Sequence, residues 1–164
     1  MSLPASIYDM VEFSPLEDFI VPLLQGLIPD VPVKSEIEEG QTFPVILARR
    51  DASFGFWDGD HRFFDQAPLI IHTYVSGPDA DQDAALLADA VRAQLFRAWR
   101  EQIVIPGRGH IVRLRMTSPP RRAPDWASPT GPVQYAELPR DVERYETRYT
   151  VTIRKPRVLA TFQP

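Results

Sequence analysis

The feature that most constrains the fold is a strand, a turn and a long amphipathic helix that follow one another between residues 68 and 102. The strand segment, 68–75, is apolar at nearly every position, which is typical of a strand covered on both faces. After the turn signal at 76–78, a helix of about 79–102 begins with acidic residues and carries arginines later, as the helix dipole favours. Its apolar stripe has helical spacing and comprises Leu87, Val91, Leu95 and Trp99. We therefore expect this helix to pack on a sheet in which 68–75 is a central strand.

The other patterns predict one more helix and four more strands. Ser14, Pro15 and Glu17 have the spacing of a capping box with proline in the first turn, so a helix should start there. The expected strands are 31–38 and 42–50, joined by a turn at Glu39-Gly40, followed later by 110–117 and 144–155. The chain therefore predicts an α+β domain with the element order α-β-β-β-α-β-β.

The chain divides into one domain with appended segments. Residues 1–13 read as an N-terminal arm, 14–155 as a single domain, and 156–164 as a C-terminal tail. Seventeen prolines cluster at 4–44 and 106–139, and they leave 118–141 as a long proline-rich extension without helical period. A loop of this length inside a compact domain is usually functional or disordered, so we expect it to dock against something.

Composition excludes several classes of function. There is no cysteine, which rules out disulfides and thiolate metal sites, and no apolar run long enough to predict a membrane span. The net charge of −4 is unevenly distributed: residues 1–107 carry 7 basic and 17 acidic residues, whereas 108–164 carry 11 and 5. This asymmetry suits head-to-tail self-association, unless folding mixes the two halves across one surface.

Candidate reactive groups are few. The polar loop residues Asp58, Asp60, His61 and Asp65 have the side chains that bind hard cations, but their spacing does not fit a calcium loop. The histidines occupy a loop and two strands, no G-x-S-x-G elbow is present, and Pro106-Gly107-Arg108-Gly109 precedes a strand rather than a helix. We therefore expect no catalytic residues, no bound metal and no cofactor, and we expect His72 to lie in the core.

Two irregular segments carry residues typical of protein contacts. Five large aromatic residues fall within 54–64, too many to be comfortably solvated in one loop. Arginine and tryptophan, which are enriched at interface anchors, occur together in the proline-rich extension. Nucleic-acid binding is opposed by the acidic charge of the chain. The expected subunit or partner contacts are Phe56, Trp57, Asp58, Arg62, Phe64, Asp65, Arg121, Arg122 and Trp126.

The chain resembles the tail terminator proteins of long-tailed, siphovirus-like bacteriophages. The residues that carry the resemblance are Phe56-Trp57-Asp58, Arg62-Phe63-Phe64-Asp65, Leu69–Tyr74 and Asp79–Trp99, within a match of about 14–155. The resemblance implies a mixed, mainly antiparallel sheet with two helices packed on one face. It also implies a homohexameric ring that caps the head-proximal end of the tail tube, ends polymerisation of the tube and joins the tail to the head.

The resemblance implies partners and a location as well. The tail tube protein would meet one face of the ring and a neck or connector protein the other, while DNA passes through the lumen without specific binding. The protein would be assembled in the host cytoplasm, reside in the virion and contact no membrane. Two alternatives stay open: another neck or head-to-tail connector protein of the same virion, and a small hydrolase or ligand-binding α+β domain that uses the region of His61 and Asp65.

Overall fold

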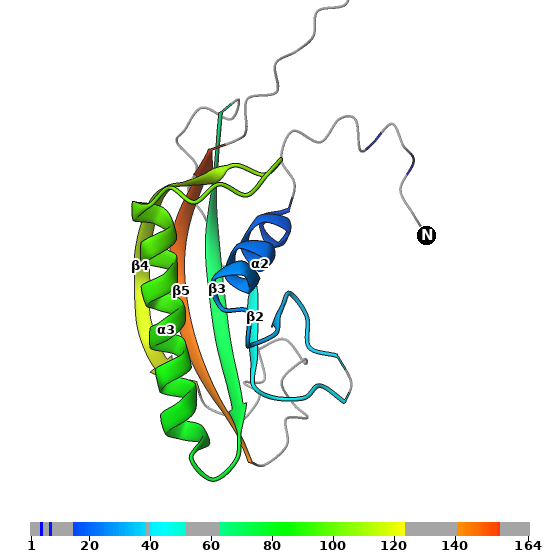
Figure 1. The fold of residues 1–164 in the computed structure, drawn as a ribbon, viewed down its shortest axis with the longest axis vertical. Coiled ribbons are helices and arrows are strands. Elements are labelled where there is room, and N and C mark those ends of the chain that lie inside the picture. The colour runs from blue at the N-terminus through cyan, green and yellow to red at the C-terminus, as the bar shows by residue number, and fades with distance from the viewer. Residues whose placement is uncertain are drawn as a thin grey trace, which may run out of the picture.

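A computed structural model describes residues 15–38, 40–51, 63–123 and 141–154, together with Pro4 and Ile7. In chain order the elements are α2 (Leu16–Leu27), β1 (Val33–Lys34), β2 (Val45–Arg50), β3 (Phe64–Ser76), α3 (Ala80–Arg100), β4 (His110–Arg122) and β5 (Val142–Arg154) (Figure 1). The α+β class and the predicted order α-β-β-β-α-β-β are therefore confirmed.

The strands form one five-stranded sheet in the order β1-β2-β3-β5-β4. Only the short pairing of β1 with β2 is parallel, and the other three pairings are antiparallel. The prediction of a central strand at 68–75 is confirmed, because β3 lies between β2 and β5 and is buried on both faces from Leu69 to Val75.

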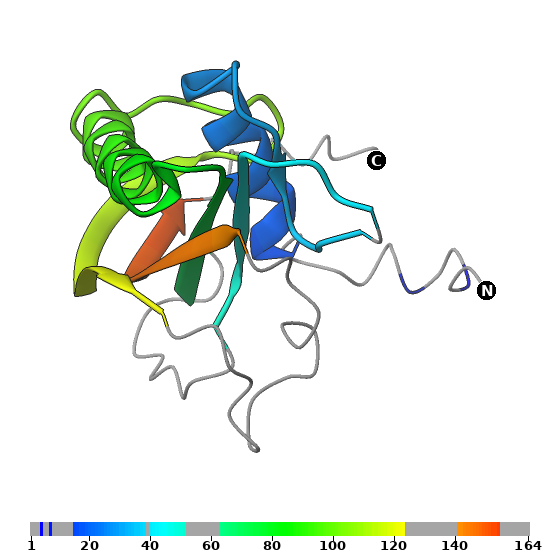
Figure 2. The same cartoon turned by 90° about the horizontal axis from the view of Figure 1, so that it is seen from below.

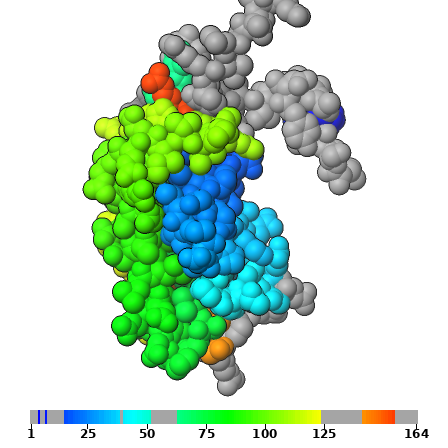
Figure 3. Space-filling view, in the orientation of Figure 1, coloured from blue at the N-terminus to red at the C-terminus, as the bar shows by residue number. Residues whose placement is uncertain are grey.

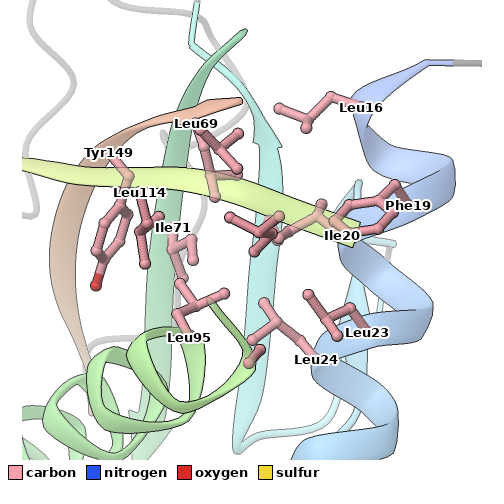
Figure 4. Packing of buried hydrophobic residues seen from close by; sticks show 14 of the residues in the cluster. Leu16, Phe19, Ile20, Leu23, Leu24, Leu69, Ile71, Leu95, Leu114 and Tyr149 are labelled. Carbon is pink, nitrogen blue, oxygen red and sulfur yellow. The ribbon is translucent and has the colours of Figure 1, made fainter. Parts of the chain in front are cut away.

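Both helices cover the same face of the sheet, which we call the helix face (Figure 2). In the space-filling view, α3 and α2 lie next to each other on this face (Figure 3). The main core fills the layer between the helices and the strands. Figure 4 shows Ile20 and Leu24 of α2 and Leu95 of α3 pointing toward Leu69 and Ile71 of β3, and all five side chains are buried.

Side-chain hydrogen bonds fix the helices to the strands. Gln25 of α2 accepts a hydrogen bond from the backbone N–H of Val33 at 2.9 Å, which holds β1 beside the helix. Trp99 of α3 donates its indole N–H to the carbonyl of Val112 on β4 at 3.0 Å. Between them, Thr73 donates to the carbonyl of Ala84 at 3.1 Å in the buried layer. Each bond gives a hydrogen-bond partner to a polar group that packing shields from water.

The opposite face, which we call the helix-free face, has a smaller apolar cluster over β2 and β3. Val45, Leu47, Tyr74 and Val142 form it, and Ile37 and Phe43 pack against them. The rings of Phe43 and Tyr74 lie 6.1 Å apart, within the range of a favourable aromatic contact. The segment between β1 and β2 thus supplies the apolar cover for this part of the sheet.

The expected strand 31–38 is wrong in most of its length. Only Val33–Lys34 is a strand, and it pairs in parallel with β2. The physical reason is that Ile37 and Phe43 bury their side chains in the cluster of the helix-free face, which the chain cannot do while continuing straight along the sheet edge. Glu39 of the expected turn lies outside the described residues.

β3 and β4 are longer than expected, whereas β2, at Val45–Arg50, is shorter than the expected strand 42–50. β3 begins at Phe64, four residues before the start of the expected strand 68–75. β4 continues to Arg122, so residues 118–122 belong to the sheet and not to the proline-rich extension. Pairing with all of β5 explains the length of β3, since its thirteen residues each have a partner there. β4 is an edge strand with shifts of register, and an edge tolerates Pro119 and Pro120 because its outer N–H groups need no partner.

The helix starts differ from their predicted caps. In α2 the carboxylate of Glu17 accepts a hydrogen bond from the backbone N–H of Arg50 at 2.7 Å, and Pro15 takes the cap position. Ser14 of the expected capping box lies outside the described residues. In α3 Asp79 is the cap residue, but its side chain makes no capping hydrogen bond. The α2 carboxylate is thus used to bind a strand rather than its own helix start.

Candidate functional site

Four of the nine expected contact residues lie in the described part of the chain. Phe64 and Asp65 begin β3, whereas Arg121 and Arg122 end β4. Phe64 pairs with Arg154 on β5. Arg122 pairs with Tyr145, which lies nine positions earlier on β5. At about 3.4 Å per residue, the two sets are separated by roughly 30 Å along the sheet. The other five contact residues lie outside the described residues: Phe56, Trp57, Asp58, Arg62 and Trp126.

Asp65 lies on the helix face and is paired within the chain. Its carboxylate accepts a hydrogen bond from the guanidinium of Arg50 at 3.4 Å. The same Arg50 donates its backbone N–H to Glu17, so this pair joins the end of β2 to the first turn of α2. Phe64, one residue earlier, is half-buried on the helix-free face. The structure thus gives Asp65 a structural partner at the end of the sheet.

Arg122 also lies on the helix face, at the opposite end of the sheet. Its guanidinium donates to the carboxylate of Glu143 and lies 3.5 Å from that of Asp81. The hydroxyl of Tyr145 donates to the same Asp81 at 3.1 Å. Burial and this hydrogen bond both raise the pKa of Tyr145. The cluster ties β4 and β5 to the first turn of α3.

Arg121 points to the helix-free face and enters an ionic network that the sequence did not predict. The network consists of Asp51, Arg121, Glu146 and Arg148. Glu146 accepts hydrogen bonds from Arg121 and from Arg148, each at 2.8 Å. Arg148 donates in addition to Asp51 at 3.1 Å, just beyond the end of β2. Two strands, β4 and β5, and the segment after β2 are therefore linked through charged side chains.

Glu146 is ionised at neutral pH although its side chain is only 11% exposed. Burial by itself raises the pKa of this carboxyl, but the hydrogen bonds from Arg121 and Arg148 outweigh burial, and the pKa lies below its ordinary value of 4.5. The hydrogen bond to Glu146 in turn raises the pKa of Arg148. The network is thus a fixed set of charges rather than an acid–base pair that titrates near neutral pH.

His72 lies beside the network in the middle of β3, where it pairs with Glu146 in the sheet register. It is 2% exposed, which confirms the expected core position. Burial, followed by the positive charge of the neighbouring Arg144, lowers the pKa of His72 to about 3. The imidazole is therefore neutral across the physiological range, and neither His72 nor Glu146 changes its protonation state there.

One signal could have revealed part of the network. Glu146 and Arg148 are two residues apart in the strand that was predicted at 144–155, so they share one face and their opposite charges lie side by side. Asp51 and Arg121 could not be joined to them, because both residues fall outside the strands that the sequence predicts. The sheet register supplies that information, since it places Arg121 opposite Glu146.

The residues considered as candidate metal ligands or catalytic groups lie only partly in the described part of the chain. Within 15–38, 40–51, 63–123 and 141–154, no group of three or more histidine or acidic side chains is placed to hold a metal ion. Asp58, Asp60 and His61 lie outside the described residues. His110 pairs with Arg154 and His72 with Glu146, so these two histidines lie in different parts of the sheet. In the same described ranges, no helix has the length and apolarity needed to cross a membrane.

No protein-family model matches the chain, and comparison with curated proteins yields no match. The candidate site is therefore defined by geometry alone. In the described residues, each face of the sheet carries its own clusters of paired charges. The clusters on the helix face contact the first turns of α2 and α3.

Proposed function

We propose that the chain is a structural virion protein, a tail terminator that assembles into a ring on the head-proximal end of a phage tail tube. The observation that carries the proposal is the architecture. The element order, the mainly antiparallel sheet and the placement of both helices on one face all agree with the fold that the resemblance implies. The proposal needs no reactive group, because the protein acts through its shape.

The mechanism is geometric. One surface of the ring reproduces the docking surface of a tube subunit, so it binds the last tube ring. The opposite surface does not, so no further tube subunit is added, and the neck protein binds there instead. The acidic net charge of −4 suits a channel through which DNA passes without being held.

Paired charges support this role because an assembly surface must keep its shape. Glu146 and Arg122 each hold groups from separate elements in fixed positions. A ring contact made by such side chains loses less conformational freedom on binding than one made by mobile side chains. The same clusters would keep successive subunits at a constant angle.

Electron microscopy of the purified protein tests the ring, and addition of the tube protein tests its task. We expect rings of uniform size that bind tube ends and stop elongation of the tube. A chain that stays monomeric, or rings that leave tube growth unchanged, would contradict the proposal. Capture of a connector protein without capture of tube protein would indicate another neck protein of the same virion.

A further inference from the structure

The outer strand β4 carries a basic strip on the helix-free face. We define the strip as Arg113 and Arg115, which pair with Thr152 and Thr150 of β5. Both arginines are exposed, and neither has an ion pair or hydrogen bond within the described ranges. They differ in this from Arg121 and Arg122 on the same strand, whose charges are matched by acidic residues.

The opposite edge of the sheet carries the complementary charge. Exposed acidic residues flank the short strand β1, and we call Asp30, Glu36 and Glu38 the acidic edge. Glu38 pairs with Lys34 at 2.7 Å, whereas Asp30 and Glu36 have no ion pair among the residues that the structure describes. The strand order places β1 and β4 at the two ends of the sheet, and Figure 1 shows β4 and β2 on opposite sides of the molecule.

The sheet places the strands from the two parts of the chain on different sides. β1, β2 and β3 come from the acidic half, residues 1–107, while β5 and β4 come from the basic half and lie together beyond β3. A different strand order would have interleaved them. Folding still mixes the two halves in part, since α3 packs on β4 and Asp81 and Asp51 pair with Arg122 and Arg148. The difference that remains lies at the two edges of the sheet, between the exposed arginines of β4 and the exposed acidic residues beside β1.

We propose that the basic strip of one copy binds the acidic edge of the next copy. The two surfaces are different and lie on opposite sides of the chain, so the contact is head-to-tail, and repetition of it closes a ring when the rotation between copies allows. This inference rests on the proposed ring and names the charges that join its subunits. Side chains rather than added strand pairing make the contact, because β4 is irregular in register and contains Pro119 and Pro120.

A second copy fits the strip better than nucleic acid does. The whole chain is acidic, and its net charge of −4 opposes the approach of phosphates. A second copy, in contrast, brings unpaired acids of its own to unpaired arginines.

Charge reversal with mixing tests the contact. One variant carries Arg113→Glu and Arg115→Glu, and the other carries Asp30→Arg and Glu36→Arg. Oligomers are measured by mass photometry and negative-stain microscopy at about 0.15 M salt, where the Debye length is about 8 Å. Each variant alone should associate at least about tenfold more weakly than wild type, because like charges then face one another. An equal mixture of the two should recover rings, since every contact then joins opposite charges.

A matched control separates local from general charge effects. The control carries Arg97→Glu and Arg100→Glu on the exposed surface of α3. It changes the net charge by the same amount as the Arg113→Glu and Arg115→Glu variant, and it should assemble like wild type. Circular dichroism must show that all variants are folded. Normal assembly of both reversal variants, or failure of the mixture to form rings, would overturn the inference while leaving the proposed function standing.

Two further outcomes distinguish the remaining possibilities. A wild-type chain that is monomeric at every concentration would overturn the proposed ring and this contact together. Fluorescence anisotropy with labelled duplex DNA tests whether the basic strip binds nucleic acid instead. If wild type binds the duplex, and the Arg113→Glu and Arg115→Glu variant loses that binding but still forms rings, the strip is a nucleic-acid contact and the inference is wrong.

Discussion

Glu146 accepts hydrogen bonds from two arginines on different strands, so removal of its charge leaves two guanidinium groups without their partner. We expect Glu146→Gln to lower the free energy of unfolding by about 1–3 kcal/mol, the usual cost of disrupting a largely buried charged hydrogen bond. Urea denaturation at neutral pH measures the change. Glu101→Gln removes an exposed partner of Arg97 on α3 and is the matched control, with an expected loss below about 1 kcal/mol. Equal losses in the two variants would contradict the structural role of Glu146.

The contribution of Glu146 should depend on pH in a defined direction. Its pKa is lower in the folded chain than the ordinary value of 4.5, so its stabilisation is complete above 4.5 and is lost as the pH falls through the folded pKa. The difference in unfolding free energy between wild type and Glu146→Gln should therefore be constant near neutral pH and shrink below 4.5. A difference that does not change with pH would indicate that the variant acts through packing alone.

His72 gives a second pH dependence in a separate window. Its pKa falls from 6.5 to about 3 on folding, so below 6.5 the unfolded chain binds a proton that the folded chain excludes. Stability should therefore decrease as the pH falls from 6.5 toward 3, with a slope of up to about 1.4 kcal/mol per pH unit from this group. His72→Gln should remove that slope between pH 6.5 and 4.5, before Glu146 titrates. Parallel curves for the two proteins would contradict this assignment.

At the scale of elements, α3 offers a comparison within one helix. Leu95 is fully buried between α3 and the sheet, whereas Leu86 is 60% exposed. Leu95→Ala should lower the free energy of unfolding by about 2–5 kcal/mol because it leaves a cavity in the core. Leu86→Ala should change it by no more than about 0.5 kcal/mol, the range of surface substitutions. A similar loss for both leucines, measured by chemical denaturation, would mean that the buried face of the helix is misassigned.

The elements with a strong local signal were predictable, and those that depend on distant partners were not. The stripe of Val91 and Leu95 and the two-faced burial of β3 follow from periodicity, because each reflects how a segment meets its immediate surroundings. β1 and the ends of β3 and β4 depend on pairing with other strands. A sequence read segment by segment does not contain those registers. Arg121 was assigned to a loop for this reason, although it lies opposite Glu146 in the sheet.

At the scale of the whole molecule, the proposed assembly can be tested through the expected contact residues. Trp57 and Trp126 lie outside the described residues, so their assignment to contacts remains a prediction from sequence. We expect Trp57→Ala and Trp126→Ala each to weaken ring formation or tail joining, since buried tryptophans at interfaces often contribute about 2 kcal/mol or more. Electron microscopy of rings and an assay of tail joining measure the effect. Unchanged assembly in both variants, with the fold intact, would show that these residues are not contacts.

The charge pattern shows what sequence could and could not say about the molecule. The uneven charge of the two halves was evident from composition, but its meaning depended on whether folding would mix them. The structure shows partial mixing, because Asp81 and Asp51 of the acidic half pair with Arg122 and Arg148 of the basic half. The strand order nevertheless leaves the exposed arginines of β4 at the edge opposite β1. The ionic network of the helix-free face, which joins Asp51 to residues almost a hundred positions later, required the same long-range information.

The position of β5 has a consequence for synthesis of the chain. β5 is the last of the described strands in sequence, yet it lies between β3 and β4 and pairs with both. While residues 142–154 are still inside the ribosome, both neighbours expose the backbone groups that β5 will later bind, and open strand edges favour aggregation. The sheet can therefore close only after residues 142–154 have left the ribosome. A product that ends before Val142 should accumulate as insoluble protein rather than as a smaller folded unit.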